Sequence, residues 1–160
     1  MFVMGRRYFG NPLPYDQIAI SQDVMIDAGG ESAWVVAAYA GDELIHYVMF
    51  SWDGSIVVDD VATGSTWTPQ AWQTLTMDLD LETGMATVRL DGGLVSTLAI
   101  YGDPSLGIDN LIIFGDNYVE VVPSSMFYDN LNISAIPEPA TFALLGFGMI
   151  GIVARRKESK

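Results

Sequence analysis

Residues 12–135 alternate between apolar and polar side chains in short stretches, and turn residues interrupt them. No part of this region keeps the 3.6-residue period of an amphipathic helix, so helical folds are disfavoured. We expect strands over 16–21, 23–28, 32–40, 44–52, 55–61, 72–82, 85–91, 94–100, 109–115 and 126–134. Many short strands between turns predict an all-β sandwich or barrel.

Glycine-containing dipeptides predict three hairpin turns, at Asp53-Gly54, Thr83-Gly84 and Asp91-Gly92. A turn at Thr83-Gly84 pairs Leu79 with Val88 on an apolar face and Asp78 with Arg89 on the polar face. A slip of one residue would mix the two faces, so the pattern supports this pairing.

Composition excludes several classes of function. The 160 residues include no cysteine, which removes disulfides, thiolate metal sites and cysteine nucleophiles, and the formal net charge of −13 is the opposite of a nucleic-acid binder's. His46 is the one histidine. The sequence has no Gly-x-Ser-x-Gly motif whose serine His46 could activate as a general base. We therefore expect an ordinary strand histidine with its hydrogen bonds satisfied.

Charge divides the chain into two parts. Residues 1–136 hold 18 acidic residues, three arginines and no lysine, a net charge of −15. Residues 137–160 hold four of the seven basic residues. Such asymmetry predicts that the two parts meet different environments.

The C-terminal part combines an uncharged stretch with a basic end. Residues 140–154 would form a helix of roughly 22 Å, short for a bilayer core of about 30 Å, but bilayer thinning and snorkelling arginines make a transmembrane helix feasible. Arg155, Arg156 and Lys157 would then act as a stop-transfer cluster on the cytoplasmic side. A buried C-terminal core helix is the alternative.

Pro137, Glu138 and Pro139 precede this stretch. Their order, followed by a glycine-rich apolar segment and an arginine cluster, resembles the PEP-CTERM protein-sorting domain of Gram-negative bacteria that make exopolysaccharide. The resemblance implies that an exosortase, an integral-membrane protease, cuts near these three residues. It also implies an exported protein that is held in the inner membrane before processing and reaches the cell envelope or extracellular matrix afterwards.

The N-terminal residues do not match an export signal. Residues 1–12 contain an arginine pair, Arg6-Arg7, but no apolar h-region. We therefore expect that a signal peptide, and with it a first strand of the domain, is missing from this sequence.

Two segments of the body resemble concanavalin A-like lectin/glucanase and laminin G-like sandwiches. They are residues 72–92, WQTLTMDLDLETGMATVRLDG, and residues 126–134, MFYDNLNIS. The resemblance implies an antiparallel jelly-roll β-sandwich over residues 1–135, followed by a sorting tail over 136–160 with one hydrophobic helix. This fold hosts sugar binders, glucanases and structural modules.

Asp78, Asp80 and Glu82 share one strand face and match a glucanase pattern loosely. Alternate strand residues lie roughly 6.7 Å apart, whereas retaining glycosidases hold their two carboxyl groups about 5–5.5 Å apart. We expect a solvated face with one cross-strand ion pair and no catalytic residue; cation binding is the alternative.

Candidate ligand contacts remain for calcium and for sugar. Asp129 and Asn130 resemble a pair that lies beside a structural calcium in such sandwiches, while turn chemistry alone is the other interpretation; we expect no other cofactor. Trp67, in a loop, and Trp52, beside a turn, are the candidate sugar contacts. Trp34 and Trp72 are expected in the core.

Two functions fit these features. The first is a non-enzymatic, exported surface or matrix protein, lectin-like or structural, whose partners are the exosortase, the inner membrane and exopolysaccharide. The second is a polysaccharide-active enzyme of the glucanase type.

Overall fold

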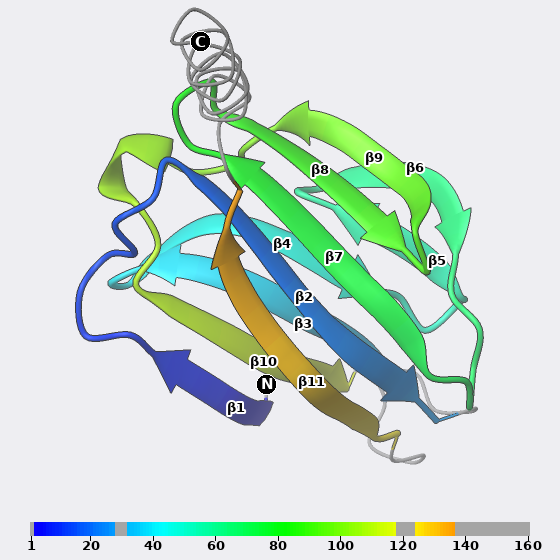
Figure 1. The fold of residues 1–160 in the computed structure, drawn as a ribbon. Helices are drawn as coiled ribbons and strands as arrows, with labels where there is room; N and C mark the ends of the chain where they lie inside the picture. The colour runs from blue at the N-terminus through cyan, green and yellow to red at the C-terminus, as the bar shows by residue number, and fades with distance from the viewer. Residues whose placement is uncertain (1, 28–31, 118–123, 137–160) are drawn as a thin grey trace, which may run out of the picture.

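A computed structural model describes residues 2–27, 32–117 and 124–136 of the chain. Two antiparallel sheets face each other across a shared apolar core (Figure 1). The predicted all-β sandwich is confirmed. The expected C-terminal helix lies outside the described residues.

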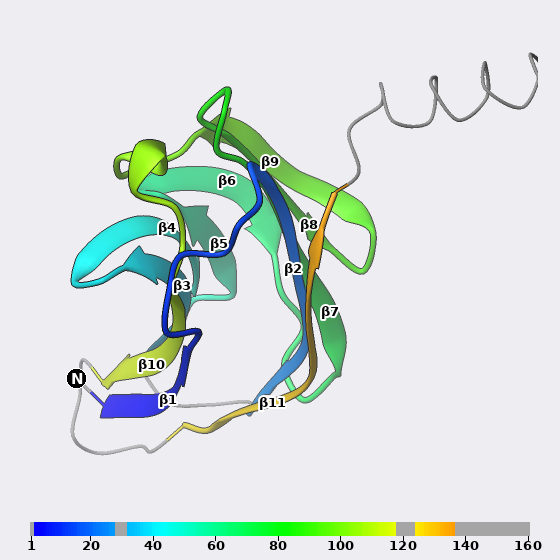
Figure 2. The same cartoon turned by 60° about the vertical axis from the view of Figure 1, so that its left-hand side comes forward.

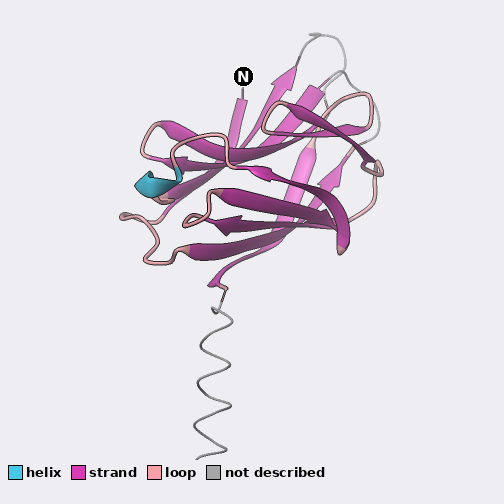
Figure 3. Cartoon of the chain, turned by 90° about the horizontal axis from the view of Figure 1, so that it is seen from above, coloured by secondary structure: helices cyan, strands magenta, loops and turns pink. Residues whose placement is uncertain are grey.

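One sheet has six strands and the other has five. In spatial order, the six-stranded sheet contains β1 (Phe2–Tyr8), β10 (Asn110–Asn117), β3 (Ser32–Ala40), β4 (Glu43–Phe50), β5 (Ser55–Val58) and β6 (Val61–Thr66). The five-stranded sheet contains β11 (Met126–Ala135), β2 (Gln17–Ile26), β7 (Gln73–Asp80), β8 (Met85–Leu90) and β9 (Gly93–Ala99). Figure 2 shows the two sheets from the side. The 3-10 turn η1 (Pro104–Leu106) is the one helical element of the described ranges (Figure 3).

The core forms because most inward residues of the strands are apolar, with Gln22 of β2 as a buried polar exception. Along β2 every second residue is buried, as expected for a strand with one solvated face. The two sheets contribute facing sets of buried side chains, among them Ile18, Ile20, Val24, Leu75, Met77 and Leu79 from the five-stranded sheet and Trp34, Val36, Val48, Phe50 and Ile56 from the six-stranded sheet. At roughly 1.5–3 kcal/mol for each large buried side chain, this core is the main source of stability.

The hairpin of β7 and β8 has the predicted faces but not the predicted register. Leu79 lies opposite Ala86, and Asp78 lies opposite Thr87. The turn takes four residues, 81–84, instead of two, so each partner moves by two positions. Because side chains alternate with a period of two, a shift of two residues leaves both faces intact.

Other strand predictions are corrected by the structure. Residues 2–8 form β1 and residues 62–66 belong to β6, where no strand was expected, and the expected pair 16–21 and 23–28 is the single strand β2. The expected strand 55–61 is interrupted at Asp59 and Asp60, whose φ angles of 47° and 64° are left-handed. They form the tight turn from β5 to β6, because short aspartate side chains tolerate this conformation better than most.

Within the described ranges, no helical segment has the length and apolar character that crossing a bilayer needs. The predicted sorting residues Pro137, Glu138 and Pro139 and the basic cluster Arg155, Arg156 and Lys157 lie outside the described residues.

Candidate functional site

The outer face of the six-stranded sheet carries an aromatic hollow. On β3, Trp34, Val36 and Ala38 point into the core, so the residues between them point to the opposite face. There a hollow of about 260 Å³ is lined by Val35, Ala37, Tyr39, Leu44, Tyr47, Asp60, Tyr101 and Phe114, and we call it the tyrosine hollow.

The floor of the hollow is small and apolar, and its walls are aromatic. Val35 and Ala37 are buried although they lie on the outer face. The rings of Tyr47 and Tyr101 meet edge to face with their centroids 6.1 Å apart. Such a pair contributes about 0.5–1.5 kcal/mol beyond its buried area, while the Tyr101 side chain stays 55% exposed.

Gly102 explains how Tyr101 reaches the hollow. Its N–H donates to the carbonyl of Ile45 over 3.0 Å, which holds the loop against β4. A Cβ at this position would lie 2.2 Å from the carbonyl oxygen of Leu44, so only glycine allows this approach.

A short polar network closes one side of the hollow. The hydroxyl of Tyr47 donates to Oδ1 of Asp60 over 2.6 Å, and the Asp60 N–H donates back to that hydroxyl oxygen over 2.8 Å. Burial, followed by the hydrogen bond to Asp60, raises the pKa of Tyr47 from 10.0 to about 12. The hydroxyl therefore stays protonated at neutral pH.

Beneath this network lies a buried pair of His46 and Asp59. Nδ1 of His46 is 2.5 Å from one carboxylate oxygen of Asp59, and the other oxygen accepts the Tyr47 N–H over 2.8 Å. His46 faces the core because it alternates along β4 with the buried residues Val48 and Phe50. The bulge in the pairing of β3 with β4 lies one residue earlier, at Ile45. The expected strand histidine is thus satisfied at Nδ1, while Nε2 is buried with no hydrogen-bond partner among the described residues.

This arrangement suits a small ligand with one apolar face and several hydroxyl groups. Ligand sites are typically concave and mostly apolar, with a few polar groups that orient the ligand. Here the tyrosine hydroxyls and the Asp60 carboxylate supply those polar groups at the edge of an apolar floor.

The predicted sugar contacts Trp52 and Trp67 lie elsewhere, at the turn from β4 to β5. The Trp67 indole N–H donates to the carbonyl of Ser51 over 2.9 Å, and its half-buried ring packs against the core. Trp52 lies in this turn and is 54% exposed. The turn brings the two tryptophans into one region, beyond the end of β4, and their contact with sugar stays a prediction.

The other two tryptophans differ from each other. Trp34 is buried, as predicted. Trp72 is 52% exposed, so its predicted place in the core is wrong. It directly precedes β7 and alternates with the outward residues Thr74 and Thr76, whereas Leu75 and Met77 point inward.

The three acidic residues near the β7–β8 turn are partly engaged in local contacts. Asp78 makes an ion pair with Arg89, as predicted, although the corrected register makes it a diagonal contact. Asp80 accepts the Thr83 N–H over 2.9 Å, and Glu82 lies in the turn beyond the strand. That none of them is catalytic stays a prediction.

Asp129 of β11 lies opposite Asp23 of β2, and Asn130, the next residue, begins a bulge in this pairing. Asn130 has a left-handed φ of 52°, and its side-chain amide donates to Asp23 over 2.8 Å. Hydrogen bonds from Asn130 and from Thr74 hold the pKa of Asp23 below its usual range. No group of three or more acidic or histidine side chains placed to hold a metal ion occurs within the described ranges. The calcium site at Asp129 and Asn130 stays a prediction.

Sequence reasoning missed the tyrosine hollow itself. Its residues come from β3, β4, β10 and two loops, and no local motif joins them. The one available signal was the position of Tyr39 and Tyr47 on strands with alternating polarity. This pattern predicts an exposed or half-covered aromatic face, but it does not predict that the face is hollowed.

Comparison with known proteins addresses the tail and the body separately. The model of the PEP-CTERM protein-sorting motif matches residues 135–157. The chain carries a PEP-CTERM sorting motif. This motif indicates export through the exosortase pathway, and no curated protein sequence matches the chain.

Solved structures similar to the body of this chain are β-sandwiches. Sheep galectin-11 is 11% identical, with a TM-score of 0.56 over 78% of this chain and 98% of its own. A human galectin-16 variant is 10% identical, with a TM-score of 0.61 over 85% of this chain and 98% of its own. A sialidase is 11% identical, with a TM-score of 0.59 over 78% of this chain, which spans only 14% of that enzyme. At such low identity these matches show the fold, which agrees with the expected concanavalin A-like sandwich.

Proposed function

We propose that this PEP-CTERM protein is an exported surface or matrix protein whose sandwich binds carbohydrate in the tyrosine hollow. The hollow is the observation that carries the binding part of the proposal. The sorting motif supports the export part.

The route to the surface follows from the order of the tail. The apolar segment 140–154 holds the chain in the inner membrane, with Arg155, Arg156 and Lys157 on the cytoplasmic side. Exosortase then cuts near Pro137, Glu138 and Pro139, and the body passes to the cell envelope or the extracellular matrix. Exopolysaccharide is the ligand available there.

The chemistry of the hollow favours a sugar. A pyranose has an apolar face of C–H groups that packs on aromatic rings, and Tyr47, Tyr101 and Phe114 provide such rings around the floor. Its hydroxyl groups can hydrogen-bond to the tyrosine hydroxyls and to Asp60. The structurally similar galectins are lectins, which agrees with this ligand class.

Binding is favoured over hydrolysis by the carboxylates available. Glycosidases use two carboxyl groups, about 5–9.5 Å apart. Among the residues that line the hollow, Asp60 is the one carboxylate, and one of its oxygens already accepts the Tyr47 hydroxyl. The glucanase-type alternative lacks a carboxylate pair at this place.

The test is calorimetric titration of the sandwich with oligosaccharides from exopolysaccharide, accompanied by an assay for new reducing ends. We expect binding without cleavage. Tyr47→Ala and Tyr101→Ala should abolish it, whereas Trp72→Ala, which changes an exposed aromatic away from the hollow, should not. Cleavage of the oligosaccharide would favour the enzyme instead, and binding that survives both tyrosine variants would contradict the proposed site.

A further inference from the structure

The sandwich stays hydrogen-bonded up to Ile136, the residue directly before Pro137. Ala135 of β11 lies opposite Ile18 of β2, and the Ile136 N–H donates to the carbonyl of Gln17 over 3.0 Å. The next residue, Pro137, has no N–H and cannot continue the ladder. No flexible spacer therefore separates the folded body from the processing motif.

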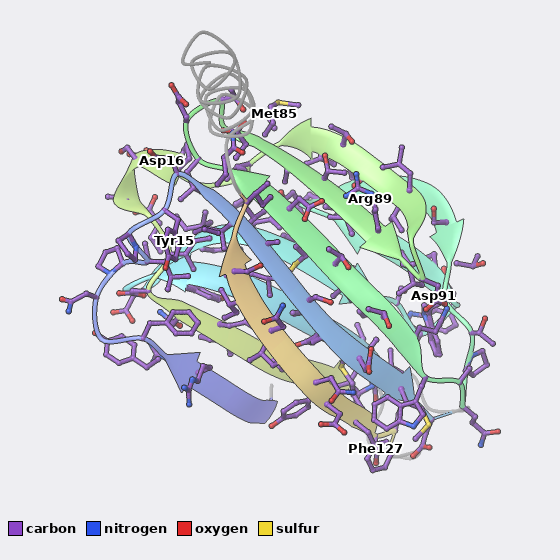
Figure 4. All side chains as sticks on the ribbon, viewed as in Figure 1. Tyr15, Asp16, Met85, Arg89, Asp91 and Phe127 are labelled. Carbon is purple, nitrogen blue, oxygen red and sulfur yellow. The ribbon has the colours of Figure 1, made fainter. Side chains whose placement is uncertain are left out.

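A groove lies beside the point where β11 leaves the sheet. Its volume is about 510 Å³, and its lining includes Pro14, Tyr15, Asp16, Glu82, Pro104 and Leu106; we call it the tail-end groove. Asp16 is the residue directly before Gln17, which receives the last hydrogen bond of β11. Figure 4 shows Tyr15 and Asp16 at this end of the sandwich.

Three loops form the groove, and backbone hydrogen bonds hold them in place. The Leu81 N–H donates to Asp16 over 2.7 Å, and the Leu13 N–H donates to Ile108 over 2.8 Å. The third loop is held by η1, where the Asp103 carboxylate accepts the Ser105 N–H over 2.9 Å. A surface that is formed before its partner arrives loses little entropy on binding.

The groove combines exposed apolar side chains with acidic ones. Tyr15 is 44% exposed and Leu106 is 42% exposed, although both are large apolar or aromatic residues. Asp16 and Glu82 are exposed, and no basic residue is in the lining. Its complement is therefore an apolar surface flanked by basic side chains.

We propose that the tail-end groove is a docking surface for the exosortase that processes the chain, an inference that rests on the proposed export route. Three residues span about 10 Å at most, so a protease that cuts within 137–139 must contact this end of the sandwich. The partner surface that complements this groove presents apolar side chains flanked by basic ones. A lipid surface fits less well, because anionic headgroups would repel the carboxylates of Asp16 and Glu82 in the groove.

The experiment follows processing in the full chain, exported behind a secretory leader in a host that has an exosortase. Leu106→Asp and Tyr15→Ser remove the apolar contacts, and Trp72→Asp is the matched control at the opposite end of β7. Pulse-chase labelling measures how fast the apolar tail is lost. We expect the two groove variants to be processed about fivefold more slowly, because losing one well-packed apolar contact weakens an interface by about this factor. The control should be processed at the same rate as the parent.

Two further arms separate the explanations. A flexible spacer of about ten residues between Ile136 and Pro137 should remove the effect of Leu106→Asp, because the bond then lies far from the groove. If the groove binds a basic protein surface, Glu82→Lys should slow processing, because the new charge repels that surface. If the groove instead contacts anionic lipid, the same change should speed processing. Far-ultraviolet circular dichroism checks that each variant keeps its strands.

The outcomes are distinguishable. If the parent is never processed, the export route itself fails, and the docking surface with it. If the parent is processed but both groove variants match it, or if the spacer alone speeds processing, the docking surface is refuted while the export route stands.

Discussion

Replacing Asp59 with alanine should strongly destabilise the sandwich. The carboxylate accepts the Tyr47 N–H over 2.8 Å and lies 2.5 Å from Nδ1 of His46, and both residues of the pair are buried. Alanine removes both contacts and leaves two buried polar groups without a partner. It also places an alanine at a φ of 47°, which aspartate tolerates better.

The size of the effect follows from these losses. Each buried polar group left without a partner costs about 1–3 kcal/mol. The left-handed backbone adds about 1 kcal/mol for alanine. A total of about 4 kcal/mol is a large part of a typical stability of about 5–15 kcal/mol.

Thermal unfolding of residues 1–136, followed by circular dichroism, measures this loss. We expect Asp59→Ala to lower the unfolding midpoint by about 10 °C. Asp59→Asn is the matched control, because its amide oxygen still accepts the Tyr47 N–H and its NH₂ can donate to Nδ1. It should cost only about 1 kcal/mol. Equal midpoints for the parent and Asp59→Ala would refute the role of the buried pair.

Four other outcomes are expected. Because the pKa of Tyr47 is raised to about 12, its contribution to stability is fully present below pH 10 and is lost as the pH rises through 12. A near-ultraviolet titration should show one tyrosine that ionises at a higher pH than the others, and Tyr47→Phe should remove that step. Hydrogen bonds from Ser105 hold the pKa of Asp103 below its usual range, so its contribution is lost as the pH falls through that lowered pKa, and Asp103→Asn should flatten the acid limb of the unfolding curve. Gly102→Ala should cost about 1–3 kcal/mol in urea unfolding and weaken sugar binding, because its Cβ would meet the Leu44 carbonyl. Asp78→Asn should change the free energy of unfolding by no more than about 1 kcal/mol, since its ion pair with Arg89 is partly exposed.

The alternating pattern was sufficient to predict the sandwich and the faces of its strands. It could not predict the register of β7 with β8, because a shift of two residues puts the same side chains on the same faces. The turn from Asp91 to Gly92 was predicted correctly, since both residues have the left-handed φ that a two-residue turn requires. The turn at Asp59 was missed, because two aspartates are a weaker turn signal than an aspartate followed by glycine.

The candidate site was harder to predict than the fold. Tyr101 reaches the hollow only because Gly102 lets its loop lie against β4, and Phe114 arrives through the pairing of β10 with β3. Both depend on contacts between residues far apart in sequence. The sorting motif was predictable because its chemistry lies in one short segment, which the match to residues 135–157 confirms.

Carbohydrate binding in the tyrosine hollow can be mapped residue by residue in an NMR titration. Amide resonances of the isotope-labelled sandwich are followed while exopolysaccharide fragments are added. We expect the largest shifts at Ala37, Tyr39, Tyr47 and Tyr101. Shifts confined to the turn that carries Trp52, or no shifts at saturating fragment, would contradict binding at this site.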